Sequence, residues 1–588
     1  MRQFLKFFFA SLLGTIFGLC MIFFFGALLL AGIASVSKSK GKTEVKPNSV
    51  LEINLDYEIK ERTNENPFDP MNFSFENEGR LGLNDIVKNI QDAKTDDKIK
   101  GIYLDVSTLP AGFATVDAIR NALADFKTSG KFILAYGEMI SQKGYYLASV
   151  ADEIYVNPVG YMDLSGFRTE LMFFKGLLNK LEIEPQVIYC GKYKSATEPF
   201  RLDKMSDENR EQVSYVINDI YGRFIKNISE SRKLPEALVD SIADNLLVRD
   251  IDDAVNLKLI DGAIYYDQVL AKLKEKTGVE EKDKLHAVSI QKYGDGEDEK
   301  HQSRNERIAV LYAEGNIVDG KGEEDNIGSE RFAKTIREIR EDDKVKALVF
   351  RINSGGGSAL ASDVILREIE LTKQKMPVIV SMGDVAASGG YYIACKADTI
   401  IAEPNTITGS IGVFGMLPNM QGFFNNKLGI TFDGVKTGKF SDIGTTSRPL
   451  TAEERSIIQI GIDSIYMEFK DRVASGRGKT IEYIDSIAQG RIWTGVQAKE
   501  NGLVDVLGNL DDAVKIAAEK AGLTDYSVRA FPKQKDPLEK ILESFGSEAE
   551  TFVMQRKLGD YYPVWQKMEE VRNLSGVQAR MPFELEIY

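Results

Sequence analysis

Histidine is scarce in this chain. Two copies, His286 and His301, occur among 588 residues, and both lie in a polar stretch midway along the sequence. A Ser-His-Asp or Cys-His hydrolase needs a firmly held imidazole as its base, and a histidine-rich metal site needs several. If the chain is a hydrolase, its general base is therefore expected to be another residue, and neither a metal nor a cofactor is predicted.

Cysteine and basic charge are scarce too. Three cysteines cannot form a disulfide framework, and Cys20, Cys190 and Cys395 are expected to be unpaired thiols in apolar surroundings. The formal net charge is −14, so no basic field favours a nucleic-acid partner, and none is predicted. The length of 588 residues exceeds what one hydrophobic core supports and indicates two or more domains.

One long apolar run lies at the N-terminus. Residues 7–36 contain no charged residue, which exceeds the ~20 residues that span a bilayer and the roughly 7–15 of a cleaved signal peptide. We expect residues 1–46 to be an uncleaved transmembrane anchor, with the rest of the chain on one side of the membrane. Ser35 and Lys38 match the pattern S-x-x-K at the end of this run, and we interpret them as flanking residues.

The remainder of the chain contains a repeat of domain size. At a constant offset (98 against 344, 152 against 398), three pairs of segments match: 98–106 with 344–352, 137–146 with 383–392, and 152–158 with 398–404. After a slip of one residue, GKYK at 191–194 matches GKFS at 438–441. The sequence therefore predicts two copies of one domain.

Each copy alternates short β-rich runs with helical periodicity, which predicts an α/β fold of parallel βαβ units. In the second copy, strands are expected near 308–312, 346–352, 377–382 and 399–403, with a helix over 358–373. The runs VFRI and PVIVS are apolar on both faces, as buried parallel strands are. Thr451 and Glu454 predict a capping box at the start of a long helix.

These patterns divide the chain after the anchor. The polar stretch 279–305 marks the expected boundary between a first domain, 47–300, and a second domain, 301–536, although its segment HAVSI has the character of an edge strand. Residues 537–588 are expected to form a helical tail that ends in a strand-like segment, MPFELEIY.

Two positions differ between the copies in a complementary way. Ser388, in Ala-Ala-Ser-Gly-Gly, corresponds to Gln142, and Lys194, in Gly-Lys-Tyr-Lys-Ser-Ala, corresponds to Ser441. An isolated serine before a helix is more often a cap, and an isolated lysine is more often a solvated surface residue. One site split between the copies explains both differences, so we predict that Ser388 is a nucleophile and Lys194 its general base.

Glycines and a further serine surround these positions. Gly355 and Gly356 follow a predicted strand, where their N–H groups can face an oxyanion, although a plain turn explains them equally well in isolation. Beside Ser388 they become a natural oxyanion hole, with one donor from Gly355 or Gly356 and another from Gly389. Ser410 is expected to orient the lysine amine, and a turn serine is the alternative from the residues alone.

A lysine acts as a base only when its amine is neutral. The reference pKa of lysine is ~10.4, and burial lowers it by up to ~3–5 units in extreme cases. We therefore expect Lys194 in an apolar cleft between the domains. There it would take the Ser388 proton as an acyl-enzyme forms and would later activate water.

Four motifs carry a family resemblance: YKSATEPF at 193–200, NSGGGSA at 353–359, MGDVAASGGYYIA at 382–394 and TGSIGVFG at 408–415. Together they resemble the signal peptide peptidase A family in its long, duplicated bacterial form, also called protease IV. The resemblance covers nearly the whole chain, anchor included. The usual glycine loop of the family reads Ser-Pro-Gly-Gly, whereas this chain has Gly355 in place of the proline.

The resemblance implies a crotonase-like, Clp-protease-like fold in each copy and a Ser-Lys dyad formed by Ser388 and Lys194, with Ser410 as the partner of the lysine. It also implies a single-pass protein of the bacterial inner membrane, assembled as a homotetramer, with its catalytic domain on the periplasmic side. The implied substrates are signal peptides left in the membrane and other short apolar peptides.

Two rival functions remain open. An acyl-CoA enzyme would use similar glycine loops to hold a thioester oxyanion and would be stabilised by CoA, although the anchor and the complementary serine and lysine argue against it. A non-catalytic membrane scaffold would bind other proteases and leave Ser388 unreactive toward a serine-directed probe.

Overall fold

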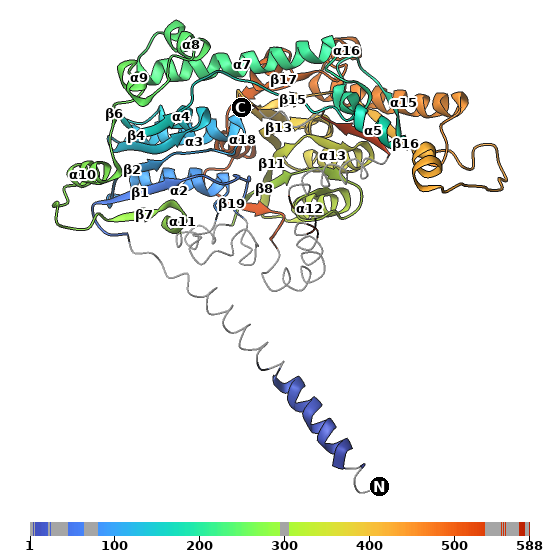
Figure 1. Ribbon diagram of the computed structural model, residues 1–588, viewed down its shortest axis with the longest axis horizontal. Helices are drawn as coiled ribbons and strands as arrows, with labels where there is room; N and C mark the ends of the chain where they lie inside the picture. The colour runs from blue at the N-terminus through green and yellow to red at the C-terminus, as the bar shows by residue number, and fades with distance from the viewer. Residues whose placement is uncertain are drawn as a thin grey trace.

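Figure 1 shows the computed structural model of the chain. It describes residues 4, 6–21, 24, 45–63, 80–294, 305–534, 554, 557, 559, 576–581 and 587. Within these residues the chain forms three β-sheets accompanied by helices. The predicted α/β class is therefore confirmed.

The predicted anchor is described only in part. Residues 6–21 are helical, whereas residues 25–36 and the pair Ser35 and Lys38 lie outside the described residues. No helix in the described part of the chain is both long enough and apolar enough to cross a membrane.

The first sheet is built from residues before position 290. Its strand order is β6-β4-β3-β2-β1-β7, and every neighbouring pair is parallel. The strands are β1 (Ser49–Asn54), β2 (Ile99–Asp105), β3 (Phe132–Ile140), β4 (Glu153–Met162), β6 (Gly262–Ala263) and β7 (Ala287–Ser289). Helices α2 (Leu83–Thr95) and α3 (Phe113–Lys127) connect consecutive strands, which confirms the βαβ prediction, and β7 is the edge strand expected in HAVSI.

The second sheet resembles the first and has the order β17-β15-β13-β11-β8-β19, with β14 pairing beside β13 and β18 beside β14. Strands β15 (Ile407–Gly409), β17 (Ile492–Thr494), β18 (Val506–Leu507) and β19 (Ser527–Phe531) complete it, and the β15–β17 pair is antiparallel. The four strands predicted for the second copy are present as β8 (Arg307–Glu314), β11 (Val345–Ser354), β13 (Val378–Ala387) and β14 (Thr399–Ala402). They pair in parallel, and α13 (Ala359–Lys373) confirms the predicted helix. Strand β13 continues past its predicted end at 382 to Ala387, directly before Ser388.

The duplication extends to the helices that follow each sheet. Helices α7 (Asp207–Arg232) and α15 (Ala452–Arg477) are both 26 residues long, and each follows a hydroxyl cap. The predicted capping box of Thr451 and Glu454 is present at the start of α15. Figure 1 shows α7 along the top of the molecule, above both sheets, so a helix of the first half also covers the second.

A third sheet joins distant parts of the chain, in the order β10-β9-β12-β20-β16-β5. Its first two strands are β10 (Ile327–Gly328) and β9 (Ile317–Val318). Strand β5 (Glu184–Tyr189) of the first half pairs antiparallel with β16 (Phe414–Asn419) of the second. Strand β20 (Val577–Arg580) lies between β12 (Gly356–Ser358) and β16 and is antiparallel to both. The strand of the tail thus comes ahead of the expected segment 581–588, of which 582–586 and 588 lie outside the described residues.

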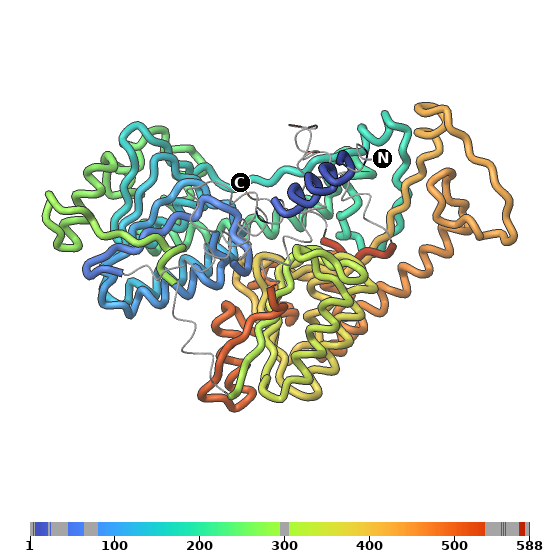
Figure 2. The backbone as a smooth tube through the Cα atoms, turned by 90° about the horizontal axis from the view of Figure 1, so that it is seen from below, coloured from blue at the N-terminus to red at the C-terminus, as the bar shows by residue number. Residues whose placement is uncertain are grey.

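Polar contacts bind the two halves to each other. Thr115 Oγ1 donates to Asp384 Oδ2 at 2.6 Å, and Asn405 Nδ2 donates to Asp117 Oδ2 at 2.6 Å. Figures 1 and 2 both show the halves side by side, in contact along the middle of the molecule. This contact allows a side chain of one half to be held by the backbone of the other.

Candidate active site

Ser388 stands at the sharp turn between β13 and α14 (Gly389–Ala394). Its φ of 54° and ψ of −113° are rare for a residue with a Cβ, and its N–H donates to the Gly409 carbonyl at 2.8 Å, which fixes the turn. The side chain makes no cap hydrogen bond to α14. The cap interpretation is therefore wrong for Ser388, and the backbone strain here is of the kind that gathers at functional sites.

The amine of Lys194 meets this hydroxyl. Lys194 Nζ lies 2.8 Å from Ser388 Oγ, 3.1 Å from Ser410 Oγ and 3.2 Å from the Ser410 carbonyl oxygen. Lys194 is 1% exposed, and Ser388 and Ser410 are 0% exposed. The structure thus brings together, within one chain, the three side chains that the sequence placed in one site.

The second half holds the backbone of Lys194. Tyr193 N–H donates to the Gln489 carbonyl at 2.9 Å. Gly490 passes so close that an added Cβ would lie 2.7 Å from Lys194 Cα, and its φ of +78° favours glycine. The lysine therefore belongs to the first half by sequence, but its position depends on a loop of the second.

Gln212 of α7 hydrogen-bonds to backbone of both halves next to Lys194. Its Nε2 donates to the Tyr193 carbonyl at 3.0 Å, and its Oε1 accepts from Ile492 N–H at 3.2 Å. Sequence reasoning missed Gln212 and Gly490. A glutamine in a polar helix gives no signal of burial, whereas the glycine in Gln-Gly-Arg was a visible turn signal.

Burial holds the pKa of the Lys194 amine well below its usual value, because desolvation penalises the ammonium form. A neutral amine has two N–H donors and one lone pair. A neutral Lys194 amine can donate both N–H groups to the two oxygens of Ser410 and turn its lone pair to the O–H of Ser388, whose Oγ also lies 3.4 Å from the Gly412 carbonyl oxygen. This is the arrangement that a general base needs before it takes a proton.

Ser410 occupies an unusual backbone conformation of its own. Its φ is 50°, and its N–H donates to the Arg491 carbonyl at 2.7 Å. The strand before it, β15 (Ile407–Gly409), pairs with the end of β13, so Ser410 emerges beside Ser388. Neighbouring strands therefore set the spacing of these two serines.

The predicted oxyanion glycines gather beside the turn at Ser388. Gly389 opens α14, and Gly356 lies so close that an added Cβ would be 2.6 Å from Gly389 N. Gly356 N–H donates to Ser354 Oγ at 3.1 Å in this state. Gly355 immediately precedes β12. A side chain at Gly356 would fill the space in front of the Gly389 donor.

The corresponding position of the first half is filled by a side chain. Gln142 Oε1 accepts from the N–H groups of Ser165 and Gly166 at 3.1 and 3.0 Å, and Nε2 donates to the Gly166 carbonyl at 2.9 Å. Helix α4 (Gln142–Ala148) is capped by Ser141, one residue earlier, which accepts from Gly144 N–H. The serine that caps α4 in the first half, Ser141, therefore does not correspond to Ser388, which aligns with Gln142.

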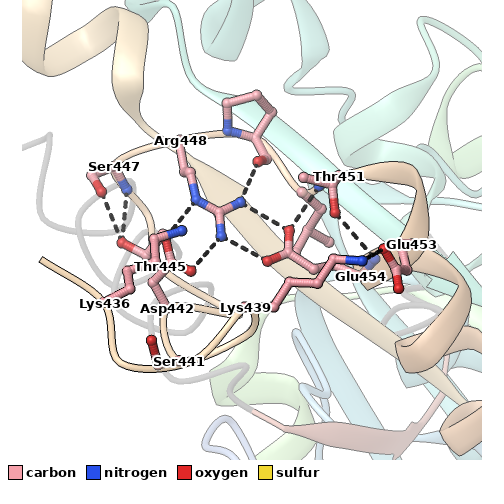
Figure 3. Close-up of polar contacts among 12 residues, drawn as sticks. Lys436, Lys439, Ser441, Asp442, Thr445, Ser447, Arg448, Thr451, Glu453 and Glu454 are labelled. Atoms are coloured by element: carbon pink, nitrogen blue, oxygen red, sulfur yellow. Dashed lines mark hydrogen bonds and ion pairs between the residues drawn. The ribbon is translucent and has the colours of Figure 1, made fainter.

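The second-half counterpart of Lys194 lies on the surface. Figure 3 shows Ser441 in the loop before α15, where its Oγ donates to the Gly438 carbonyl at 2.9 Å. The loop is fastened by ion pairs such as Arg448 Nη2 with Glu454 Oε1 at 2.7 Å. An exposed loop of this kind offers no desolvated cavity for a base.

Known proteins match the chain over most of its length. A family model described as Peptidase family S49 matches twice, at residues 125–280 and 370–524. Protease 4 of Salmonella typhi is 39% identical over 472 residues, which cover 79% of this chain and 76% of the relative. Protease 4 of Haemophilus influenzae is 34% identical over 583 residues, covering 94% and 92%. The chloroplastic serine protease SPPA of Arabidopsis thaliana is 34% identical over 511 residues, covering 85% and 74%.

These matches define a serine peptidase. The chain belongs to peptidase family S49, with one family match in each half, which confirms the resemblance found in the motifs. Among solved structures, a mutant ClpP1 of Listeria monocytogenes is 17% identical, with a TM-score of 0.24, and the match covers 35% of this chain and 94% of that chain. A likeness this slight carries no argument about the fold.

Proposed function

We propose that this chain hydrolyses peptide bonds with Ser388 as the nucleophile and Lys194 as the general base. One observation carries the proposal: Lys194 Nζ lies 2.8 Å from Ser388 Oγ at a position where burial holds the pKa of the amine well below its usual value. A serine hydroxyl needs such a base, and only a neutral lysine can serve.

The reaction follows from the geometry. Ser388 Oγ adds to the substrate carbonyl carbon while Lys194 Nζ takes its proton, and the ammonium then protonates the leaving amine. Water deprotonated by Lys194 hydrolyses the ester and restores the serine. Ser410 keeps the amine aimed at Ser388 through both stages.

The negative charge that forms on the carbonyl oxygen needs preorganised donors. We assign one to the N–H of Gly389, at the start of α14, and the other to Gly355 or Gly356. The close packing of Gly356 against Gly389 N supports this assignment. Because Gly356 N–H donates to Ser354 Oγ in this state, its use as a donor requires that bond to yield to the substrate.

The proposal also covers the domains, the membrane anchor, the substrates and the assembly of the enzyme. We assign residues 47–300 and 301–536 to two crotonase-like, Clp-protease-like domains, residues 1–46 to a membrane anchor that spans at 7–36, and 537–588 to a tail. The apolar run supports the anchor. The substrates we propose are remnant signal peptides and other short apolar peptides. Similarity to the protein named putative signal peptide peptidase SppA of Enterococcus faecium, 36% identical over 230 residues that cover 38% of this chain and 66% of that relative, supports them. The chain would act as a homotetramer on the periplasmic side of the bacterial inner membrane.

The test uses the full chain in detergent and a fluorogenic peptide with an apolar, signal-peptide-like sequence. Ser388→Ala and Lys194→Ala should each lower kcat by about 10³-fold or more while the fold, followed by circular dichroism, is unchanged. The surface variants Ser441→Ala and Lys192→Ala serve as matched controls and should keep full activity. Full activity in either site variant would overturn the assignment.

A further inference from the structure

An arginine of the second half lies next to the segment that carries the base. Arg491 follows Gly490, and its carbonyl accepts from Ser410 N–H at 2.7 Å. Its guanidinium carbon lies 4.8 Å from the centroid of the Tyr193 ring, and Tyr193 directly precedes Lys194. The backbone of Arg491 therefore contacts Ser410, and its side chain contacts the residue next to Lys194.

The guanidinium of Arg491 also contacts two further aromatic rings and a carboxylate. Its carbon lies 4.7 Å from the ring centroid of Trp493 and 5.5 Å from that of Tyr215, and Nη1 pairs with Glu211 Oε1 at 3.2 Å. The hydroxyl of Tyr193 donates to Glu211 Oε2 at 3.2 Å. A planar guanidinium can stack on rings and bind a carboxylate at the same time, so these contacts fix its position.

Exposure increases from the base outward through this cluster. Lys194 is 1% exposed and Tyr193 is 8% exposed, whereas Tyr215 is 47% exposed and the Glu211 side chain is 55% exposed. Burial is what lowers the pKa of the Lys194 amine. Because Lys194 is the next residue, movement of the Tyr193 ring into solvent would loosen the segment that encloses the amine.

The two halves differ at the position of this arginine. VDSIADNL at 239–246 aligns with IDSIAQGR at 484–491, so the counterpart of Arg491 is Leu246, which is 51% exposed. By the same correspondence, Leu246 would support Ser441, which lies on a surface loop and is no base. The arginine is thus found in the half that holds the lysine and is replaced in the half that does not.

We propose that Arg491 is a positioning residue that holds Tyr193, and through it Lys194, against the loop of Ser410 and keeps water away from the amine. The inference rests on the proposed function. Lys192 also lies over the Tyr193 ring, 4.7 Å from its centroid, but it belongs to the same segment, so this contact cannot fix the segment against the second half. Arg491 reaches the ring from that half.

The first experiment compares Arg491→Ala with Tyr193→Ala in the full chain. Each variant removes one partner of the same contact, so each should let water reach Lys194 and move the midpoint of kcat against pH up by about one unit. At a pH below the midpoint, this shift lowers the neutral fraction of the amine, and with it kcat, by about tenfold, while KM for the apolar peptide is unchanged. The double variant should show no larger shift than either single variant, because the contact is lost only once.

Arg491→Lys tests what the guanidinium supplies. Lysine keeps the charge and can pair with Glu211, but it has no plane to stack on the rings, so it should remove only part of the shift. A purely electrostatic effect of Arg491 on Lys194 would be restored in full by lysine and would leave Tyr193→Ala at the wild-type midpoint. That pair of results would overturn the positioning role.

Arg448→Ala is the matched control for the loss of an arginine. Arg448 pairs with Asp442 at 2.8 Å and with Glu454 at 2.7 Å in the loop before α15 (Figure 3). Its removal should lower the free energy of unfolding, measured in urea, without moving the midpoint. An equal shift in Arg448→Ala would show that loss of stability alone moves the midpoint, and the inference would fall.

The two proposals fail in different ways. The pH dependence of Ser388 labelling by a fluorophosphonate gives the midpoint without a peptide substrate. If Arg491→Ala keeps the wild-type midpoint in this assay, or if it does not fold and Tyr193→Ala keeps that midpoint, Arg491 has no positioning role, although Ser388 and Lys194 still form the site. If Ser388→Ala keeps its activity, the site itself is wrong.

Discussion

The two halves of this chain share one plan and differ at the positions that matter for chemistry. Where the second half has Ser388 and Ser410, the first has Gln142 and Leu164, both buried. Where the first half has Lys194 in a desolvated pocket, the second has Ser441 on an exposed loop. The comparison teaches that duplication preserved the strands and helices in both copies, whereas a single reaction needs only one set of reacting groups.

The largest expected effect comes from giving position 388 of the second half the residue found at the matching first-half position, Gln142. Ser388→Gln should abolish peptide hydrolysis, with a loss of about 10⁴-fold or more, because a carboxamide cannot act as the nucleophile. The reciprocal change, Gln142→Ser, should add no activity, because the buried lysines among the described residues, Lys194 and Lys470, contact Ser388 and Asp485. Kinetics with a fluorogenic apolar peptide measure both, and a second active centre created by Gln142→Ser would break the comparison.

The next effect concerns the loop that holds Lys194. Gly490→Ala should lower kcat by about 10²-fold, because its Cβ would lie 2.7 Å from Lys194 Cα and displace the base. Gly522→Ala is a matched control, since it has a similar φ of +68° with nothing within 4 Å of its Cβ. Equal losses of kcat in the two variants would show that strain in the backbone, and not displacement of Lys194, causes the loss.

A stability difference should follow from Glu403, whose counterpart in the first half is the neutral Asn157. Burial raises the pKa of Glu403 to about 8. Between about pH 4.5 and pH 8 the unfolded chain has lost this proton and the folded chain has kept it, so stability falls as pH rises. Glu403→Gln should therefore raise the free energy of unfolding at pH 8 by roughly 4 kcal/mol and leave it unchanged near pH 4.

Urea denaturation at both pH values measures this change in the free energy of unfolding. Glu468→Gln, on the exposed side of α15, is the control, because its side chain is 51% exposed. A pH-independent effect of Glu403→Gln would contradict the assigned protonation state.

The smallest expected effect concerns Ser410. Ser410→Ala should lower kcat by about tenfold with KM unchanged, because it removes one of the two acceptors that orient the amine and leaves the carbonyl of residue 410. Ser410→Thr, which restores a hydroxyl, should recover part of the loss. In the wild type, activity should rise with pH as Lys194 loses its proton and should level off well below pH 10.5, since burial lowers the pKa of this amine. A rate that still rises at pH 11 would argue against lysine as the base.

Local patterns in the sequence predicted much of the fold. The second-half strands, the helix at 358–373 and the capping box at Thr451 all follow from periodicity and end signals, which depend on neighbouring residues. The third sheet could not be predicted this way, because β5, β16 and β20 come from three distant segments whose pairing depends on the docking of the halves. The tail strand was expected at 581–588, where apolar residues alternate with charged ones, whereas the pairing partners on β12 and β16 select 577–580.

The main residues of the candidate site could be predicted from the sequence, but the contacts that position them could not. Comparison of the two copies was enough to select Ser388 and Lys194, because a lost group leaves a mismatch at an aligned position. The strained φ of Ser388, the close approach of Gly490 and the buried Gln212 depend on tertiary packing, and no local pattern encodes them. The comparison gave no indication that Ser141 caps α4, one position before the residue aligned with Ser388.

The division of the site between the halves has a consequence during synthesis. A ribosome makes residue 194 long before residue 388, and the loop around Gly490 that holds the lysine is made later still. A nascent chain that has folded only its first half carries a base with no nucleophile and no support for that base. In the proposed mechanism, proteolysis therefore begins only after both halves have been translated and have docked.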